Sequence, residues 1–391
     1  MSDGPDRLRI LMLADFAPNP DSGAAGTEFA LATELRRQGH ELESLWADCL
    51  PHHIRHWNLY HLFEQPGAIR ALLARRYTGC EWDVLHVNQP AGWAAAREHL
   101  ARRRPALFVH RSHGFEPRVG AVVERWRRVY PEDRRPALRR LASRVLDAAI
   151  ARNYRGIVRF AEAHVVSCGE CADDLVARGV ARERVHVSPQ VPTADYFASP
   201  APRWTRERGR RLLFVGQHVF FKAPMVLAEA VERLLGSDPA LEMTWICEAA
   251  AHAQVRSRLG PAGLARVRLR DWMPREQLRG VFDTRGLFLF PSFTEGFGKV
   301  FLEAMARGLC VVSSDQGGAR DVIRSGENGV LVPVGDAEAL AREARKLIDQ
   351  PERAAAMADS ALRTAKEYTW ERVAGNLASF YRQRLAAKAA S

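Results

Sequence analysis

Short apolar runs alternate with longer stretches of helical periodicity along the whole of this chain. Such alternation is typical of strand and helix units that build a parallel sheet covered by helices, so the sequence predicts an α/β fold. Because 391 residues exceed what one hydrophobic core usually supports, we expect two domains.

The first strand and helix unit is the clearest in the amino-terminal half. Residues Arg9 to Ala14 are predicted as a buried strand, 15–25 as a loop rich in proline, glycine and serine, and Thr27 to Gln38 as a helix ending at Gly39. Further strands are expected at Val84 to Val87, Leu107 to His110 and His164 to Ser167.

A change in composition marks the expected domain boundary. Residues 198–210 combine proline and arginine with little apolar periodicity, and we place the interdomain linker there. This gives an amino-terminal domain over residues 1–200, a carboxyl-terminal domain over 208–370, and a last helix over about 371–391 that packs back on the first domain. The second domain restarts the pattern, with strands expected at Leu212 to Val215, Met243 to Cys247, Leu287 to Phe290, Val311 to Ser313 and Val330 to Val332. Two doubly wound domains would bind a ligand in the cleft between them.

Cysteine usage and the chain start bear on the cellular setting. Six scattered cysteines are too sparse for a disulfide framework, and the pair Cys168 and Cys171 lacks a second pair at metal-ligand spacing. No signal-like segment opens the sequence, and no stretch reaches the ~18 apolar residues of a membrane span. We therefore expect a cytoplasmic enzyme.

Positive charge is concentrated in one block. Residues 101–160 hold 16 Arg against 5 acidic residues, which equals the whole net charge of +11. The block either faces nucleic acid, anionic lipid or a phosphorylated acceptor, or is a solvated helical surface. Its aromatic residues do not interleave regularly with arginine, so we expect no nucleic acid partner. An anionic or membrane-associated acceptor would place the protein peripherally at the inner membrane surface.

The most informative stretch is PSFTEGFGKVFLEAMARG, residues 291–308, which follows an apolar strand. Gly296 and Gly298 let the backbone approach a ligand closely, and a helix starting near Lys299 would point its free N–H groups at the loop. The arrangement predicts an anion site. Glu295 precedes the helix, whereas Glu303 interrupts an apolar run, where a buried carboxylate needs a partner. The alternative is that Glu295 only caps the helix and Glu303 lies on its exposed side.

Glu295 and Glu303, which begin the stretches EGFG and EAMARG, resemble the E-x7-E motif of the retaining family 4 glycosyltransferases of the GT-B fold. The resemblance implies that Glu295 binds hydroxyls of a donor sugar and that Glu303 binds the ribose of the nucleotide. It also implies that the backbone N–H groups of Gly296, Phe297, Gly298, Lys299 and Val300 hold the sugar and diphosphate.

The rest of the chain extends this resemblance with departures. Gly216, Gln217 and Lys222 follow an apolar strand and resemble the glycine and the two basic residues that bind the diphosphate in this family. The family usually has Arg at the first basic position, where this chain has Gln217. Only 5 of the 57 cationic residues are Lys, which favours Lys222 as a specific phosphate ligand over a surface residue. In the first domain, Gly26 resembles a glycine of the loop over the donor phosphates, and His113 a histidine near the transferred sugar.

These residues imply a metal-independent mechanism. No Asp-x-Asp pair occurs in the sequence, so Lys222 and the helix start near Lys299 would stabilise the departing diphosphate. The resemblance implies retention by same-face attack, with His113, Lys222 and Glu295 as catalytic residues, a nucleotide-sugar as donor, and no cofactor. A sugar-nucleotide epimerase or phosphorylase of the same fold is one alternative. The other is a catalytically weakened protein that binds an anionic lipid or phosphorylated partner, which Gln217 leaves open.

Overall fold

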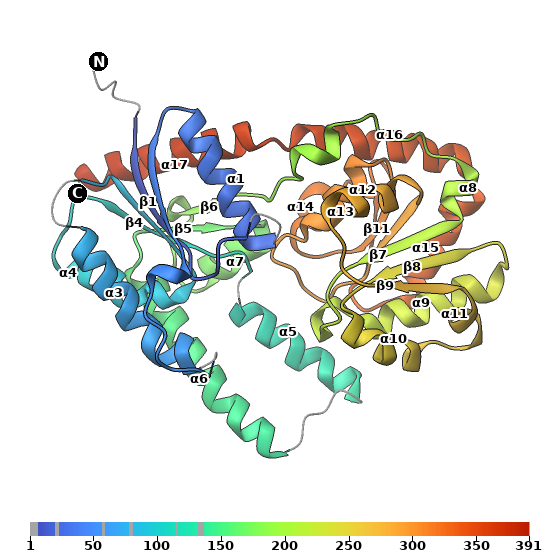
Figure 1. Ribbon diagram of the computed structural model, residues 1–391, viewed down its shortest axis with the longest axis horizontal. Coiled ribbons are helices and arrows are strands. Elements are labelled where there is room, and N and C mark those ends of the chain that lie inside the picture. Colours follow the sequence, from blue (N-terminus) through green and yellow to red (C-terminus); the bar gives the residue numbers. More distant parts are fainter. Residues whose placement is uncertain are drawn as a thin grey trace. The chain divides into compact units, whose positions relative to one another are not determined.

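The computed structural model describes residues 7–19, 23–56, 59–77, 81–114, 116–131 and 137–390. The chain forms two compact units. Unit 1 comprises residues 1–121, 131–189 and 370–391, and unit 2 comprises residues 122–130 and 190–369. Each unit contains one sheet of six parallel strands, which confirms the expected α/β class (Figure 1).

Unit 1 has the strand order β2-β1-β3-β4-β5-β6. Its strands are β1 Arg9–Leu13, β2 Glu41–Leu45, β3 Val84–Asn88, β4 Leu107–Arg111, β5 Ala163–Val166 and β6 Val185–Val187. Its helices are α1 Gly23–Arg37, α3 Gln65–Arg76, α4 Trp93–Ala101, the first part of α5 Glu116–Val129, α6 Ala137–Phe160, α7 Gly169–Ala177 and α17 Trp370–Ala389. Helices α1 and α17 pack together on one face of the sheet, and α3, α4 and α6 cover the other (Figure 1).

Unit 2 has the strand order β12-β11-β10-β7-β8-β9. Its strands are β7 Arg211–Val215, β8 Glu242–Ile246, β9 Val267–Arg270, β10 Leu287–Phe290, β11 Cys310–Ser314 and β12 Val330–Val332. Its helices are α8 Arg206–Gly209, α9 Pro224–Ser237, α10 His252–Arg258, α11 Pro261–Arg266, α12 Arg275–Asp283, α13 Lys299–Ala306, α14 Gly317–Val322, α15 Ala337–Asp349 and α16 Pro351–Glu367.

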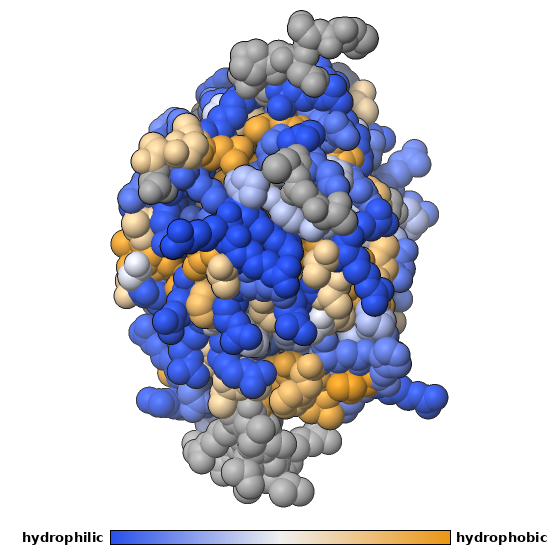
Figure 2. Space-filling view, turned by 90° about the vertical axis from the view of Figure 1, so that its left-hand side faces the viewer, coloured by the Kyte–Doolittle hydropathy of each residue, from blue (hydrophilic) through white to orange (hydrophobic). Residues whose placement is uncertain are grey.

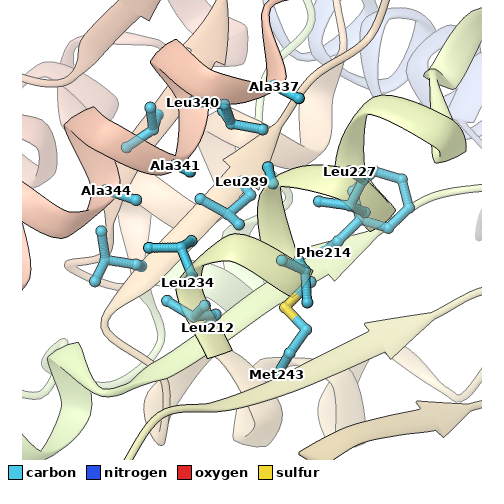
Figure 3. Close-up of a cluster of buried hydrophobic side chains, with 14 of the residues drawn as sticks. Leu212, Phe214, Leu227, Leu234, Met243, Leu289, Ala337, Leu340, Ala341 and Ala344 are labelled. Atoms are coloured by element: carbon cyan, nitrogen blue, oxygen red, sulfur yellow. The ribbon is translucent and has the colours of Figure 1, made fainter. Parts of the chain in front are cut away.

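Alternate residues of the unit 2 strands enter two different cores. Leu212 and Phe214 of β7 point to the face covered by α9 and α15, where they pack with Leu227, Leu234 and Leu340 among others (Figure 3). Leu213 and Val215 point to the opposite face, which is covered by α12, α13, α14 and part of α16. Because successive side chains of a strand point to opposite faces, a strand buried on both sides must be apolar throughout. This is why the central strands are visible in the sequence as continuous apolar runs.

The residues expected to form the interdomain linker are packed in unit 2. Trp204 is buried, and its indole N–H donates to the carbonyl of Gly286 at 3.0 Å. The Arg208 guanidinium is also buried and donates to the carbonyl of Pro202 at 2.6 Å. The division between the units falls instead at residues 189 and 190, and residues 122–130, expected in the first domain, pack in unit 2. The last helix belongs to unit 1.

Both sheets contain a point where the strand order reverses. In unit 1 it lies between β1 and β3, and in unit 2 between β7 and β10. Loops that leave the carboxyl ends of two such strands go to opposite faces of the sheet, which opens a crevice for ligands. Most of the candidate site residues lie in or just after the loops that follow these four strands, whereas His113 follows β4.

Candidate active site

In unit 2 the candidate residues come from the loops after β7 and β10. The two loops are tied together, because the backbone N–H of Phe293 donates to the carbonyl of Phe221 at 2.8 Å. Lys222 closes the first loop in the short helix η7 Phe220–Lys222, and Glu295 lies in the second loop. The residue after Lys222, Ala223, has a φ of 51°, a left-handed conformation that is uncommon for a residue with a Cβ atom. This turn directs the chain from the loop into helix α9.

Lys222 and Glu295 form a close ion pair. The Lys222 Nζ atom lies 2.5 Å from Glu295 Oε1, and the Ser292 hydroxyl donates to the same oxygen at 2.7 Å. Both charged side chains are largely shielded from solvent, with exposed fractions of 15% and 7%. The structure thus joins the residue expected to bind phosphate and the residue expected to bind sugar in one charged unit at the strand-order reversal.

The loop between Glu295 and helix α13 is shaped by glycine. Gly298 has a φ of 85°, and a Cβ atom there would lie 2.7 Å from the Phe290 ring. The Phe297 side chain is buried and packs 5.5 Å from the Phe301 ring, so it anchors the loop in the core and leaves only its backbone for a ligand. Helix α13 begins at Lys299, as expected, with Gly296, Lys299 and Val300 half-buried. The first N–H groups of this helix have no partner within the helix and favour an anion.

Glu303 is buried in the second turn of α13 and has the partner that its position requires. The Tyr196 hydroxyl donates to Glu303 Oε2 at 3.3 Å, and Lys299 Nζ lies 3.6 Å from Oε1. Burial and the neighbouring Glu303 carboxylate raise the pKa of Tyr196 well above its ordinary value, so Tyr196 stays a neutral donor. Tyr196 lies in the short helix η6 Ala194–Phe197, far from Glu303 in sequence.

Gly216 and Gln217 follow β7 directly. Gly216 is half-buried, and a Cβ atom there would lie 2.9 Å from the Phe214 ring. The Gln217 side chain is exposed, so the position that usually carries an Arg in the resembled family is open to solvent. The Glu248 carboxylate, at the end of β8, accepts the backbone N–H of His218 through both oxygens at 3.1 Å.

His113 of unit 1 follows β4, and both of its polar contacts are made by one ring nitrogen. Its Nε2 atom lies 3.0 Å from Asn88 Oδ1 and 3.1 Å from Glu28 Oε1. Two oxygen acceptors at Nε2 place the proton on that nitrogen, and Nδ1 then carries a lone pair. Among the described residues, Nδ1 has no hydrogen-bond partner. Burial lowers the pKa of His113 despite the opposing effect of Glu28, so the ring is neutral.

Glu28 is the centre of a buried polar cluster on the face of α1 and α17. Besides His113, its carboxylate lies 3.5 Å from Arg111 Nε and 3.5 Å from His86 Nε2. His86 in turn has its Nδ1 atom 2.5 Å from the Tyr381 hydroxyl of α17. Burial raises the pKa of Glu28, but its contacts with the two histidines outweigh burial and hold that pKa well below the ordinary value. The cluster therefore keeps a carboxylate charged behind a neutral His113.

Two further residues of unit 1 follow β1, one of the two strands at its reversal point. Gly26 is buried within helix α1, which begins at Gly23 rather than near Thr27 as expected. Asp15, directly after β1, is buried, and burial raises its pKa to about 7. His110 is fully buried, with its Nδ1 atom 3.2 Å from His164 Nδ1.

The arginine-rich block is not one uniform face. Arg111 is buried beside Glu28, and Arg118 pairs with Glu170 at 2.8 Å. Arg127 lies over the ring of Phe220, 5.5 Å from its centroid. The side chains of residues 132–145 lie outside the described part of the chain. The block is therefore divided between buried pairs, packing contacts and solvent.

Sequence reasoning did not single out Tyr196, Ser292, Asn88 or Glu28 as site residues. Ser292 lay within the quoted motif but carried no signal of its own, and Tyr196 lies in a segment without periodicity. Within the described residues, no three His, Cys, Asp or Glu side chains are grouped to hold a metal ion. No described helix combines the length and apolarity of a membrane span.

The chain is similar to known proteins in sequence. A family model described as "Glycosyl transferases group 1" matches residues 209–350. The D-inositol 3-phosphate glycosyltransferase of Rhodococcus opacus is 29% identical over 346 residues, which cover 81% of this chain and 77% of that protein.

Solved structures are similar over nearly the whole chain. Sucrose-phosphate synthase from Thermosynechococcus elongatus superposes with a TM-score of 0.69 at 19% identity, over 97% of this chain and 100% of that one. Anabaena Alr3699/HepE in complex with UDP and glucose superposes with a TM-score of 0.66 at 16% identity, over 95% of this chain and 98% of that one. At these identities the likeness establishes the fold.

Proposed function

Because this chain belongs to the family 4 glycosyltransferases of the GT-B fold, we propose that it transfers a sugar with retention of anomeric configuration and without a catalytic metal. The donor is a nucleotide-diphosphate sugar, and a hydroxyl group of the acceptor receives the sugar. The reading as a catalytically weakened binding protein is not favoured by these relatives.

The observation that carries the proposal is the Lys222–Glu295 pair beside the amino terminus of α13. When the bond between sugar and diphosphate breaks, negative charge grows on the diphosphate. The Lys222 ammonium and the free N–H groups at Gly298 and Lys299 are charges and dipoles that could meet it without rearrangement. Glu295 would accept hydrogen bonds from the donor sugar while its charge is balanced by Lys222.

The remaining candidate residues receive binding roles. Glu303, held by Tyr196 and Lys299, would accept the ribose hydroxyls in the ground state and the transition state alike. His113 presents Nδ1 as an acceptor for a sugar hydroxyl, because Glu28 and Asn88 occupy its other nitrogen. No protein nucleophile is assigned, since the leaving phosphate would take the acceptor's proton in a same-face attack.

Two measurements test the proposal. Thermal shift against a panel of nucleoside diphosphates should reveal the base, since a ligand at one hundred times its Kd stabilises by about 2.7 kcal/mol. UDP is the first candidate, because Alr3699/HepE was solved with it. D-inositol 3-phosphate is the first acceptor to test, because the Rhodococcus opacus relative bears that name.

Product analysis then tests mechanism. The anomeric proton coupling of the product, read by NMR, should match that of the donor, and turnover should persist in EDTA. An inverted product or complete loss of turnover in EDTA that Mg²⁺ restores would each refute that part of the proposal. No thermal response to any nucleoside diphosphate would refute the donor assignment.

A further inference from the structure

Unit 1 contains two adjoining hollows that the proposed transfer reaction does not use. The first is a cavity of about 440 Å³, and Arg155, Arg159, Arg178 and Arg184 contribute to its wall. The second has a volume of about 350 Å³ and is lined by Arg159 and Arg184 again, together with Arg384 and Lys388. Because they share two arginines, we treat them as one feature and call it the basic hollow. Its size is that of a small-ligand site.

Acidic side chains do not balance the charge of the basic hollow. No carboxylate lines the first cavity, and Glu162 is the one acidic residue that lines the second. Glu162 is already engaged, because its carboxylate lies 2.6 Å from Lys388 Nζ and accepts the backbone N–H of Phe108 at 2.8 Å. The hollow thus presents an excess of positive charge to whatever enters it.

Several arginines elsewhere on this protein have an acidic partner. Arg37 pairs with Glu34 at 2.8 Å, and Arg233 pairs with Glu229 at 2.9 Å. By contrast, no carboxylate of the described residues lies within 4.0 Å of Arg155, Arg159, Arg184 or Arg384. Four guanidinium groups without a carboxylate partner among the described residues therefore gather around one concave surface.

Arg184 is held in place rather than free to move into solvent. Its guanidinium donates to the backbone carbonyl of Glu162 at 3.0 Å and also to that of Ala161. Burial and the nearby charge of Arg384 both lower the pKa of Arg184. A cation that is partly buried and faces another cation is electrostatically unfavourable until an anion joins them. The planar guanidinium group is suited to bind phosphate through two parallel hydrogen bonds.

The basic hollow lies away from the candidate active site. Leu107, Glu162 and Arg184 stand at or just before the first residues of β4, β5 and β6. Because the strands are parallel, this is the edge of the sheet opposite to the one that carries Asn88 and His113. The side of the molecule on which the C-terminus lies is mostly hydrophilic, with apolar residues showing between the polar ones (Figure 2). Tyr154, Val158 and Val180 add apolar wall to the first cavity.

We propose that the basic hollow of unit 1 binds the phosphate group of a phosphate ester, at a site separate from that of sugar transfer. The apolar wall beside the arginines accommodates the organic part of the ester. The same chemistry occurs in a soluble sugar or polyol phosphate and in a phospholipid headgroup, and the experiment below separates these sources. The proposal does not depend on the retaining mechanism or on the acceptor.

The test removes two exposed arginines of α6 together, in the variant Arg155→Gln/Arg159→Gln. The printed contacts of these side chains are local: Arg155 Nε lies 3.4 Å from a carbonyl of its own helix, and the Arg159 guanidinium lies over the ring of the neighbouring Phe160, so the variant should fold. The probes are glycerol 3-phosphate, measured by calorimetry, and vesicles of phosphatidylcholine with or without phosphatidylglycerol, measured by co-sedimentation. Wild type should bind at least one anionic probe, and the variant should bind it more weakly by on the order of tenfold or more.

A matched control is Arg342→Gln/Arg353→Gln, which removes two exposed arginines from α15 and α16. This control should bind both probes as wild type does, and UDP affinity should be unchanged in both double variants. A response to the vesicles alone identifies a lipid headgroup, and a response to glycerol 3-phosphate identifies a soluble ester. Equal binding by wild type and the α6 variant, or no binding of any anionic probe at low salt, would overturn the proposal and leave a solvated surface.

Discussion

The two glutamates of unit 2 differ in what balances their charge. Glu295, on the loop between β10 and α13, is balanced by the ammonium group of Lys222 at 2.5 Å. Glu303 receives a hydroxyl from Tyr196, and the Lys299 ammonium lies further away at 3.6 Å. Removing one member of a buried charge pair is costly because the other is left without compensation. The two carboxylates should therefore respond differently to substitution.

We expect Lys222 and Glu295 to act as one unit in catalysis. Lys222→Ala and Glu295→Gln should each lower turnover on the order of 10²-fold, and the double variant should lose much less than the product of the two losses. Steady-state kinetics of the four proteins measure this coupling, with Lys346→Ala, at an exposed position of α15, as a control. Losses that simply multiply would show that the two residues work independently.

Glu303 should matter for the nucleotide itself. Glu303→Ala should weaken the binding of the product nucleoside diphosphate by about 1.5–3 kcal/mol and raise KM more than it lowers turnover. Tyr196→Phe should weaken it less, because it removes only one donor to the carboxylate. Glu295→Gln should leave this affinity nearly intact. Calorimetric titration of the three variants decides the assignment, and the roles are reversed if Glu295→Gln loses nucleotide affinity while Glu303→Ala keeps it.

At the scale of elements, the turn that begins helix α14 supports the Glu295 loop. Gly317 has a φ of 56°, and a Cβ atom there would lie 2.9 Å from the Cβ of Glu295. A Cβ atom on Gly318 would lie 2.6 Å from the backbone oxygen of Phe297. The two glycines thus let one backbone segment rest directly on another.

Gly318→Ala should push the loop away from its position. We expect a loss of stability of about 1–3 kcal/mol together with reduced turnover, because an added methyl group meets backbone that cannot rotate away. The control is Gly236→Ala near the end of α9, where a Cβ atom meets nothing within 4 Å. That variant should be neutral or more stable by about 0.4–1 kcal/mol. Chemical denaturation and kinetics on both variants test the prediction, which fails if Gly318→Ala behaves like the control.

The central strands could be predicted from the sequence, whereas three strands at sheet edges could not. Strands β2, β6 and β9 alternate apolar residues with Glu, His or Arg, because the side chains of these edge strands are less completely covered by other parts of the protein. Their short, mixed runs resemble ordinary loops. The anion loop and Glu303 could be predicted because a glycine pair and a carboxylate stand out within an apolar stretch. Glu28 and Tyr196 could not, because their roles arise from partners distant in the chain.

For the whole molecule, buried neutral histidines should make stability depend on acidity. Burial lowers the pKa of His164 from 6.5 to about 3 and that of His186 to about 4, and burial also lowers the pKa of His110 well below 6.5. Below pH 6.5 these histidines bind protons in the unfolded chain but stay neutral in the folded protein, so the free energy of unfolding falls as the pH falls. Asp15 acts in the opposite direction, since its folded pKa of about 7 favours the folded state as the pH falls from 7.

Three histidines outweigh one aspartate, at about 1.4 kcal/mol per pH unit for each group. Unfolding free energy should therefore drop by roughly 1 kcal/mol per pH unit near pH 6.5, where the unfolded histidines are half protonated, and by roughly 2.5 kcal/mol per pH unit near pH 5. Urea denaturation across this range measures the slope. His186→Gln should make the slope shallower by about one group, or 1.4 kcal/mol per pH unit. Equal unfolding midpoints at pH 6.5 and pH 5 would contradict the prediction.

The chain crosses from one unit to the other four times. Two of these crossings flank the short segment 122–130, which sequence analysis placed in the first domain. Its Trp126 stacks flat on Phe293, with ring centroids 4.4 Å apart, two residues before Glu295. A gene fragment that encodes residues 190–369 would produce unit 2 without this tryptophan and with an uncovered aromatic ring. A chimera between relatives would have to exchange two separate stretches of coding sequence, because unit 2 is built from two segments that are not contiguous in the chain.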